Sequence, residues 1–63
     1  MKLYETNPIF DNVKFAEMLN NNGVKAEAVE NGVLFDEDDF KAVKWANAPH
    51  WMYMNREYMK KCL

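Results

Sequence analysis

A chain of 63 residues with a single cysteine, Cys62, has to fold without an internal disulfide. A domain of this size buries only about 60% of the surface that its unfolded chain exposes. A core in a domain below about 70–80 residues seldom supplies more than about 3–5 kcal/mol. The cysteine content therefore excludes a secreted, disulfide-framed miniprotein and indicates a reducing compartment. We expect one small domain, residues 1–63, in which helix packing, self-association or a partner adds stability.

The composition is typical of a soluble globular protein, with 49% hydrophobic and 29% charged residues. No apolar run approaches the about 18 residues of a membrane span, and the first six residues lack the apolar core of a signal peptide. We therefore expect a cytoplasmic protein without a membrane partner. The formal net charge of −2 falls well short of the basic surface of a typical nucleic-acid-binding protein, so nucleic acid is not the expected partner.

The N-terminal part of the chain predicts a strand followed by a helix. Lys2–Thr6 can form a short strand, and Asn7-Pro8 ends it. Asparagine is a good N-cap and proline is favoured at the first helical position, so the helix begins there or at Asp11. Gly23 is suited to the left-handed position after the helix. The apolar residues at helical spacing are Ile9, Val13, Phe15, Ala16, Met18 and Leu19.

The next segment predicts a β-hairpin around Asn31-Gly32. Both residues tolerate the positive φ of a type I′ turn, which makes this pair the strongest short hairpin signal. Such a turn would pair Glu30 with Val33 and Ala28 with Phe35. One face of the hairpin would then be buried, and it consists of Val24, Ala26, Ala28, Val33 and Phe35.

After Phe35 the hydrophobic period changes from 2 to about 3.6, which predicts helices to the end of the chain. Asn47-Ala48-Pro49 interrupts them, and a last helix is expected from Pro49 to Lys61. Its predicted core face consists of Trp51, Met54, Tyr58 and Cys62. We therefore predict an α+β fold of order βαββαα, a small three-stranded sheet with helices packed on one face. The start resembles split βαβ modules, a likeness that carries no function.

The four acids between the hairpin and the next helix admit two interpretations. Asp36 can cap the helix, with Asp39 three residues later, and acids in a first turn interact favourably with the helix dipole. Alternatively the run, with Glu27 and Glu30, imitates a nucleic-acid backbone toward a basic groove on another protein. Capping explains most of the run. A calcium loop needs alternating oxygen ligands around a glycine, which this run lacks, so no metal is expected.

Catalysis has little support in this sequence. A nucleophile needs a base held by a third group. Cys62 and His50 are twelve residues apart along one predicted helix, too far for a hydrogen bond between them. There is no glycine-rich phosphate loop. We expect no enzyme activity, no catalytic residue and no cofactor.

The leading hypothesis is a non-enzymatic protein that binds a larger protein partner and modulates or inhibits it. Trp, Tyr and Arg are favoured at interface hot spots, and Met is an adaptable contact residue. A small acidic chain of this kind would fit a phage or mobile-element inhibitor of a host nucleic-acid-handling or defence enzyme, an association and not a derivation from the residues. The predicted contact residues are Asp36, Glu37, Asp38, Asp39, Trp45, Trp51, Tyr53 and Arg56.

Two other hypotheses rest on the last helix. Its aromatic and basic residues interleave, as in nucleic-acid-binding segments, which would fit a small DNA-associated regulator. Its apolar arc is also wider than a surface helix needs, which would fit a homodimeric structural subunit. The alternative to both is that the sheet and helices bury this arc in the protein's own core.

Overall fold

The computed structural model describes all 63 residues and confirms the predicted α+β class and the order βαββαα. The strands are β1 (Lys2–Glu5), β2 (Ala26–Val29) and β3 (Gly32–Phe35). The helices are α1 (Asn12–Asn21), α2 (Glu37–Ala42), the 3₁₀ helix η1 (Trp45–Asn47), α3 (His50–Met54) and α4 (Arg56–Lys60).

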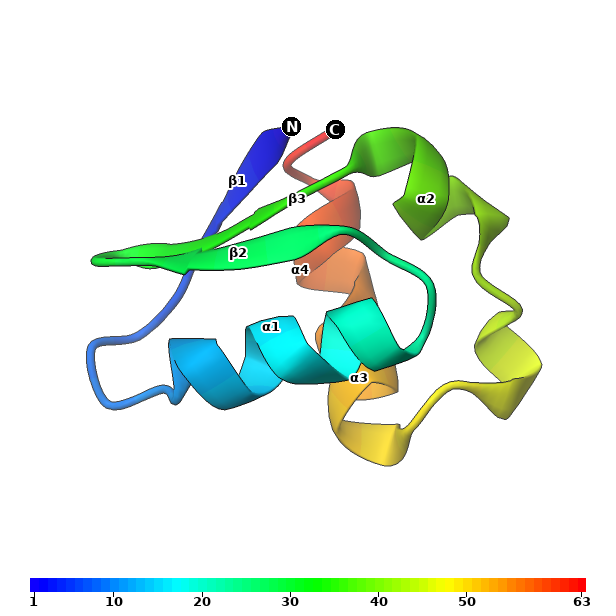
Figure 1. Cartoon of the computed structure of the whole chain (residues 1–63), viewed down its shortest axis with the longest axis horizontal. Coiled ribbons are helices and arrows are strands. Elements are labelled where there is room, and N and C mark those ends of the chain that lie inside the picture. Colours follow the sequence, from blue (N-terminus) through cyan, green and yellow to red (C-terminus); the bar gives the residue numbers. More distant parts are fainter.

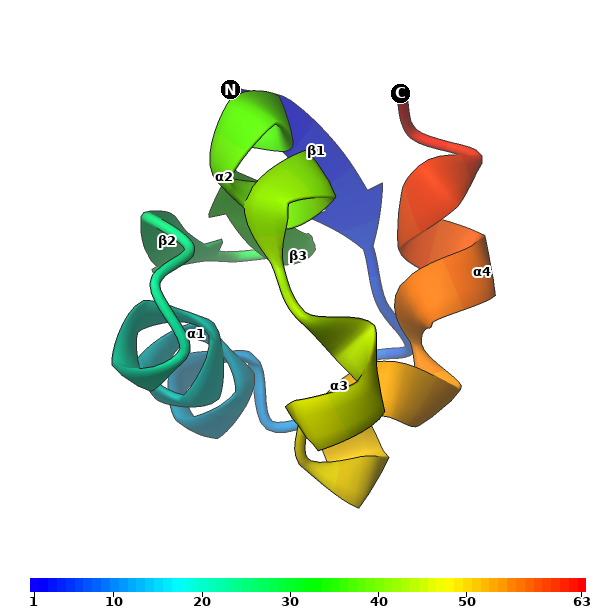
Figure 2. The same cartoon turned by 90° about the vertical axis from the view of Figure 1, so that its right-hand side faces the viewer.

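The sheet has the order β1-β3-β2, with both outer strands antiparallel to β3. The outer strands therefore run parallel to each other, and α1 connects them as in a split βαβ unit. Figure 1 shows α1, α3 and α4 on one side of the sheet and α2 beyond one end of it. Seen from the right, α1 lies below β2 and α4 lies on the side of β1 (Figure 2).

The core fills the space between the sheet and these helices. Its members come from both the sheet and the helices. They include Val24, Val33 and Phe35, which confirms that the predicted face of the hairpin is the buried one. The ten core side chains are Tyr4, Phe15, Ala16, Leu19, Val24, Val33, Phe35, Phe40, Met52 and Met59. None of the helices is both long and apolar enough to cross a lipid bilayer.

Helix α1 has a capping interaction at each end. The Asp11 carboxylate caps it by accepting a hydrogen bond from the Lys14 amide at 3.0 Å. At the other end Gly23 has φ +85°, and the Val24 amide donates to the Leu19 carbonyl at 2.9 Å, as in a Schellman motif. This turn directs the chain from α1 into β2.

Two of the residues predicted for the apolar stripe of this helix are exposed. Ile9 is 93% exposed and Val13 is 62% exposed. Ile9 precedes the N-cap at Asp11, so it lies outside the helix. The face that packs on the sheet is instead set by Phe15, Ala16 and Leu19, which are buried.

The hairpin lies where the sequence predicted it, but its register is different. Ala28 pairs with Val33 and Val29 with Gly32, so Glu30 and Asn31 form the turn, without positive φ. Gly32 belongs to the sheet because it also pairs with β1. A Cβ at Gly32 would lie 2.1 Å from the carbonyl oxygen of Tyr4, so only glycine fits there.

The predicted single helix from Pro49 to Lys61 is broken at Asn55 into α3 and α4. Of its predicted core face, Trp51 and Cys62 pack against the core, but the prediction was wrong for Met54 and Tyr58. Met52 and Met59 are fully buried, whereas Met54 and Tyr58 are about 60% exposed. The Tyr4 hydroxyl donates a hydrogen bond to the Asn55 side chain, whose amide donates to the Trp51 carbonyl at 2.8 Å. This inward asparagine sets which side of the helices faces the sheet.

Candidate functional site

The structure divides the eight predicted contact residues among three places. The four acids lie at the start of α2. Trp45, Tyr53 and Arg56 come together from η1, α3 and α4. Trp51 lies apart from these three, against α1.

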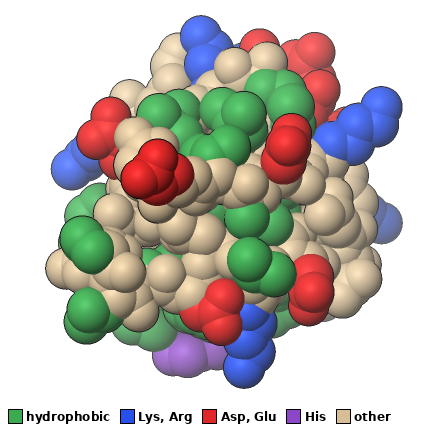
Figure 3. Space-filling view, turned by 60° about the vertical axis from the view of Figure 1, so that its left-hand side comes forward, with side chains coloured by type: hydrophobic (Ala, Val, Ile, Leu, Met, Phe, Trp, Pro, Cys, Tyr) green, Lys and Arg blue, Asp and Glu red, His purple; other side chains and the backbone are tan.

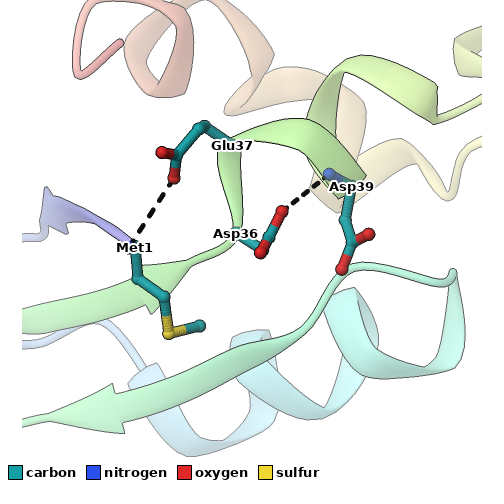
Figure 4. Close-up of polar contacts among 4 residues, drawn as sticks. All are labelled: Met1, Asp36, Glu37 and Asp39. Atoms are coloured by element: carbon teal, nitrogen blue, oxygen red, sulfur yellow. Dashed lines mark hydrogen bonds and ion pairs between the residues drawn. The ribbon is translucent and has the colours of Figure 1, made fainter.

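Three of the four acids make contacts within the chain (Figure 4). Asp36 caps α2 by accepting a hydrogen bond from the Asp39 amide at 2.9 Å. The Asp39 carboxylate accepts from the Lys25 amide at 3.1 Å. The Glu37 carboxylate lies 3.7 Å from the amino group of Met1. These contacts attach α2 to β1 and to the segment that enters β2, which confirms the capping interpretation of Asp36.

Asp38 differs from its neighbours because it is exposed and makes no hydrogen bond or ion pair within the chain. The face that comes forward in Figure 3 shows acidic side chains dispersed among apolar ones, with basic side chains nearer the rim. This view brings forward the left-hand side of Figure 1, whereas α2 and its acidic run lie toward the right-hand side. No group of three or more His, Cys, Asp or Glu side chains is arranged to hold a metal ion.

Trp45 is the centre of the second group of residues, which we call the Trp45 surface: Trp45, Tyr53 and Arg56. The indole packs against the Phe40 ring at 5.0 Å between centroids and against the Tyr53 ring at 6.4 Å, both edge to face. Phe40 in turn contacts Phe35 in the core at 5.4 Å. The aromatic contacts therefore run from the core to a Tyr53 side chain that is 50% exposed, and they fix the indole in place.

The Arg56 side chain lies over the Trp45 ring. Its guanidinium carbon is 5.2 Å from the centroid of the Trp45 ring, within the range of a cation–π interaction. No carboxylate lies within 4.0 Å of the guanidinium, since the ion pairs of the protein are Met1 with Glu37 and Lys60 with Glu57. The Nε atom is buried without a hydrogen-bond partner. The guanidinium is thus positioned by an aromatic ring and its charge is left unpaired.

Charge is unevenly distributed along the sequence that forms the Trp45 surface. Residues 40–63 contain five basic side chains and one acid, a net charge of +4, whereas residues 1–39 contain three basic and nine acidic side chains, a net charge of −6. Lys41 and Lys44 lie in the segment that leads from α2 to Trp45. Lys44 also lines a cleft of about 300 Å³, together with Asn22, which follows α1, Ala42 of α2 and Asn47 of η1.

Trp51 belongs to a separate aromatic group on the α1 side. Its ring lies 5.4 Å from the Phe10 ring and 6.0 Å from the Phe15 ring, and the Lys14 ammonium lies 5.6 Å from its centroid. It lines a second cleft of about 280 Å³ that contains Glu17. Trp51 therefore closes the core beside α1, and the structure does not bring it to the Trp45 surface.

The cysteine thiol and the buried tyrosine lie near each other at the β1–α4 side. Burial raises the pKa of Tyr4, and Cys62 and then Tyr58 raise it further. Burial also raises the pKa of the Cys62 thiol, with a smaller contribution from Glu5. A raised pKa favours the thiol over the thiolate at neutral pH, and the thiolate is the nucleophilic form.

Sequence reasoning named the members of the Trp45 surface but missed that Met54, the residue after Tyr53 in α3, is exposed. It was assigned to the core because the apolar arc of the last helix is too wide to define one inward direction. The sequence signal for the inward direction of this helix is Asn55. It is a polar residue within the apolar arc, and such a residue needs a hydrogen-bond partner when it faces the core. The chain matches no protein-family model, no curated protein and no solved structure.

Proposed function

We propose that this protein is a non-catalytic binding protein that contacts a larger protein partner through the Trp45 surface and modulates or inhibits it. The observation that carries the proposal is the convergence of Trp45, Tyr53 and Arg56, from three different elements, into one partly exposed group. These are the three residue types most enriched at interface hot spots. A fixed aromatic group of this kind binds at a low entropic cost because its side chains are already ordered.

The absence of an activated nucleophile supports a binding role. Cys62 is the only thiol, and its raised pKa opposes the reactive form. His50 is exposed at the start of α3 and has no orienting side chain bonded to it. The proposed mechanism is therefore occupation of a partner's surface.

The acidic run remains a second candidate contact, toward a basic nucleic-acid-binding groove of a host enzyme. The structure makes Asp38 the residue with which to test it, because reversing Asp39 would also remove its bond to the Lys25 amide. If the run is a contact, Asp38→Lys weakens partner binding while leaving the stability of the fold nearly unchanged. Unaltered affinity in this variant would rule out the run as a contact.

The primary test is affinity capture from a lysate of the native cells, with and without nuclease, read by mass spectrometry. The tag belongs on the C-terminus, because the amino group of Met1 is paired with Glu37. Tyr53→Ala and Tyr58→Ala form a matched pair, since both tyrosines are at least half exposed but only Tyr53 contacts Trp45.

The proposal expects a stoichiometric protein partner that survives nuclease, is lost with Tyr53→Ala and is retained with Tyr58→Ala. Recovery that depends on nucleic acid would favour the DNA-associated alternative. Recovery of the bait alone, together with concentration-dependent unfolding, would favour a homodimer. Either of these results would contradict the proposal.

A further inference from the structure

We infer that the Trp45 surface recognises an acidic segment of a protein, with a carboxylate on the Arg56 guanidinium and an apolar side chain beside Tyr53. This inference rests on the proposed function and adds the chemistry of the partner. It follows from three properties: an unpaired, positioned guanidinium, basic residues close to Trp45 in the sequence, and exposed apolar side chains in α3.

The guanidinium is the first property. An arginine over an aromatic ring keeps its edge free, and that edge offers parallel N–H donors that match the two oxygens of a carboxylate. Arg56 has no carboxylate within 4.0 Å, although the chain contains ten acidic residues. The Nη donors are therefore available to a carboxylate from outside.

The basic residues close to Trp45 are the second property, and they favour an acidic peptide segment over a nucleic acid. The segment that carries Trp45 also carries Lys41 and Lys44, and their charges, with that of Arg56, attract an anion. The whole chain has a net charge of −2, which disfavours an extended polyanion such as a nucleic-acid duplex. A short acidic segment needs to meet only the side chains beside Trp45.

The exposed apolar side chains are the third property. Tyr53 is 50% exposed beside the indole, and Met54, the next residue in α3, is 61% exposed. Methionine adapts to partners of different shape, and the tyrosine ring offers a rigid apolar face. An acidic segment that also carries a leucine or phenylalanine would use both the charge and this apolar area.

The experiment is an NMR titration of the labelled full chain, for which this sequence supplies its own reporters. Arg56 is the only arginine, so its Nε–H gives one signal, and the buried Nε protects that proton from exchange with water. Trp45 and Trp51 give the only two indole N–H signals. The probe is a short, end-blocked peptide of alternating Glu and Leu. The control peptide has Gln in place of every Glu.

The expected result is a saturable shift of the Arg56 and Trp45 signals with the Glu-Leu peptide, and little shift with the Gln-Leu peptide. The Trp51 signal should stay in place, because its ring lies against α1. Arg56→Gln should weaken binding about tenfold or more, the effect of losing a charge-assisted hydrogen bond. Lys61→Gln removes the same charge at the Tyr58 ring and should leave binding nearly unchanged.

The inference is overturned if the two peptides shift the signals equally, or if Trp51 responds and Trp45 does not. It is also overturned if Arg56→Gln and Lys61→Gln weaken binding to the same extent. Its failure is distinguishable from failure of the proposed function. A protein partner lost with Tyr53→Ala, but insensitive to Arg56→Gln, would leave the binding role intact and remove the acidic segment.

Discussion

Gly23 and Gly32 are required at their positions for different physical reasons. Gly23 has the left-handed φ of +85° that ends α1, and a Cβ there would meet nothing within 4 Å. Gly32 has no positive φ, but its backbone lies against the Tyr4 carbonyl, where a Cβ would be 2.1 Å from the oxygen. The sequence identified the reason for Gly23, because helix ends are local. It missed the reason for Gly32, because the close approach involves a strand about thirty residues earlier.

Gly32→Ala is expected to lower the free energy of unfolding by about 3 kcal/mol, the upper end of the range for overpacking, because the clashing atom is backbone. Gly23→Ala should cost less, about 1–2 kcal/mol for a left-handed residue with open space around it. Urea unfolding followed by circular dichroism measures both values. A Gly32→Ala protein at least as stable as the Gly23→Ala protein would contradict the close packing of β1 on β3.

The buried hydroxyl of Tyr4 predicts a loss of stability at alkaline pH. Its pKa is raised in the folded state, first by burial and then by Cys62, so folding favours the neutral phenol. The associated stability is present below the unfolded pKa of about 10 and is lost as the pH rises through the folded value. Tyr4→Phe should be less stable near neutral pH, by about 1 kcal/mol for the lost hydrogen bond to Asn55.

The variant should also lose less stability than the wild type as the pH rises above about 10, because the titrating hydroxyl is gone. Cys62, whose pKa is also raised, contributes a part of the alkaline loss that remains in this variant. Urea midpoints measured on both sides of this pH provide the comparison. Parallel pH profiles for the two proteins would show that Tyr4 does not carry the effect.

At the scale of elements, the order of strands and helices was readable from the sequence because its signals are local. Caps at Asp11 and Asp36, the Gly23 terminus and the change of hydrophobic period are all features of neighbouring residues. The orientation of the last two helices was not readable, because apolar residues cover about half of their circumference. In the structure the inward side carries Met52 and Met59, which are fully buried, and Asn55, which pairs with Tyr4 51 residues away.

This orientation makes a prediction from two methionines of the same segment. Met59→Ala removes a fully buried side chain and should cost about 2–5 kcal/mol, comparable to the whole stability of a domain of this size. Met54→Ala removes an exposed side chain and should stay within about 0.5 kcal/mol of the wild type. Circular dichroism and urea unfolding distinguish them. A stable Met59→Ala and an unfolded Met54→Ala would restore the helix phase that the sequence alone suggested.

At the scale of the whole molecule, the fold collects residues that the sequence could only name one by one. The sequence pointed to Trp45, Trp51, Tyr53 and Arg56 by residue type, and it could not tell which of them meet. Packing of Trp51 against α1, and of Trp45 on Phe40, separates the two tryptophans. The same fold places Arg56 over Trp45 and uses most of the acidic run in contacts that attach α2.

Hydroxyl-radical footprinting of the wild-type protein, free and bound to the partner that it captures, shows whether the Trp45 surface is the contact. Tyr53 and Tyr58 are 50% and 60% exposed, so both oxidise in the free protein. The account predicts that the partner protects Trp45 and Tyr53 and leaves Tyr58 oxidised as before. Protection of Tyr58 with Tyr53 still exposed would place the contact elsewhere and contradict the assignment of the Trp45 surface.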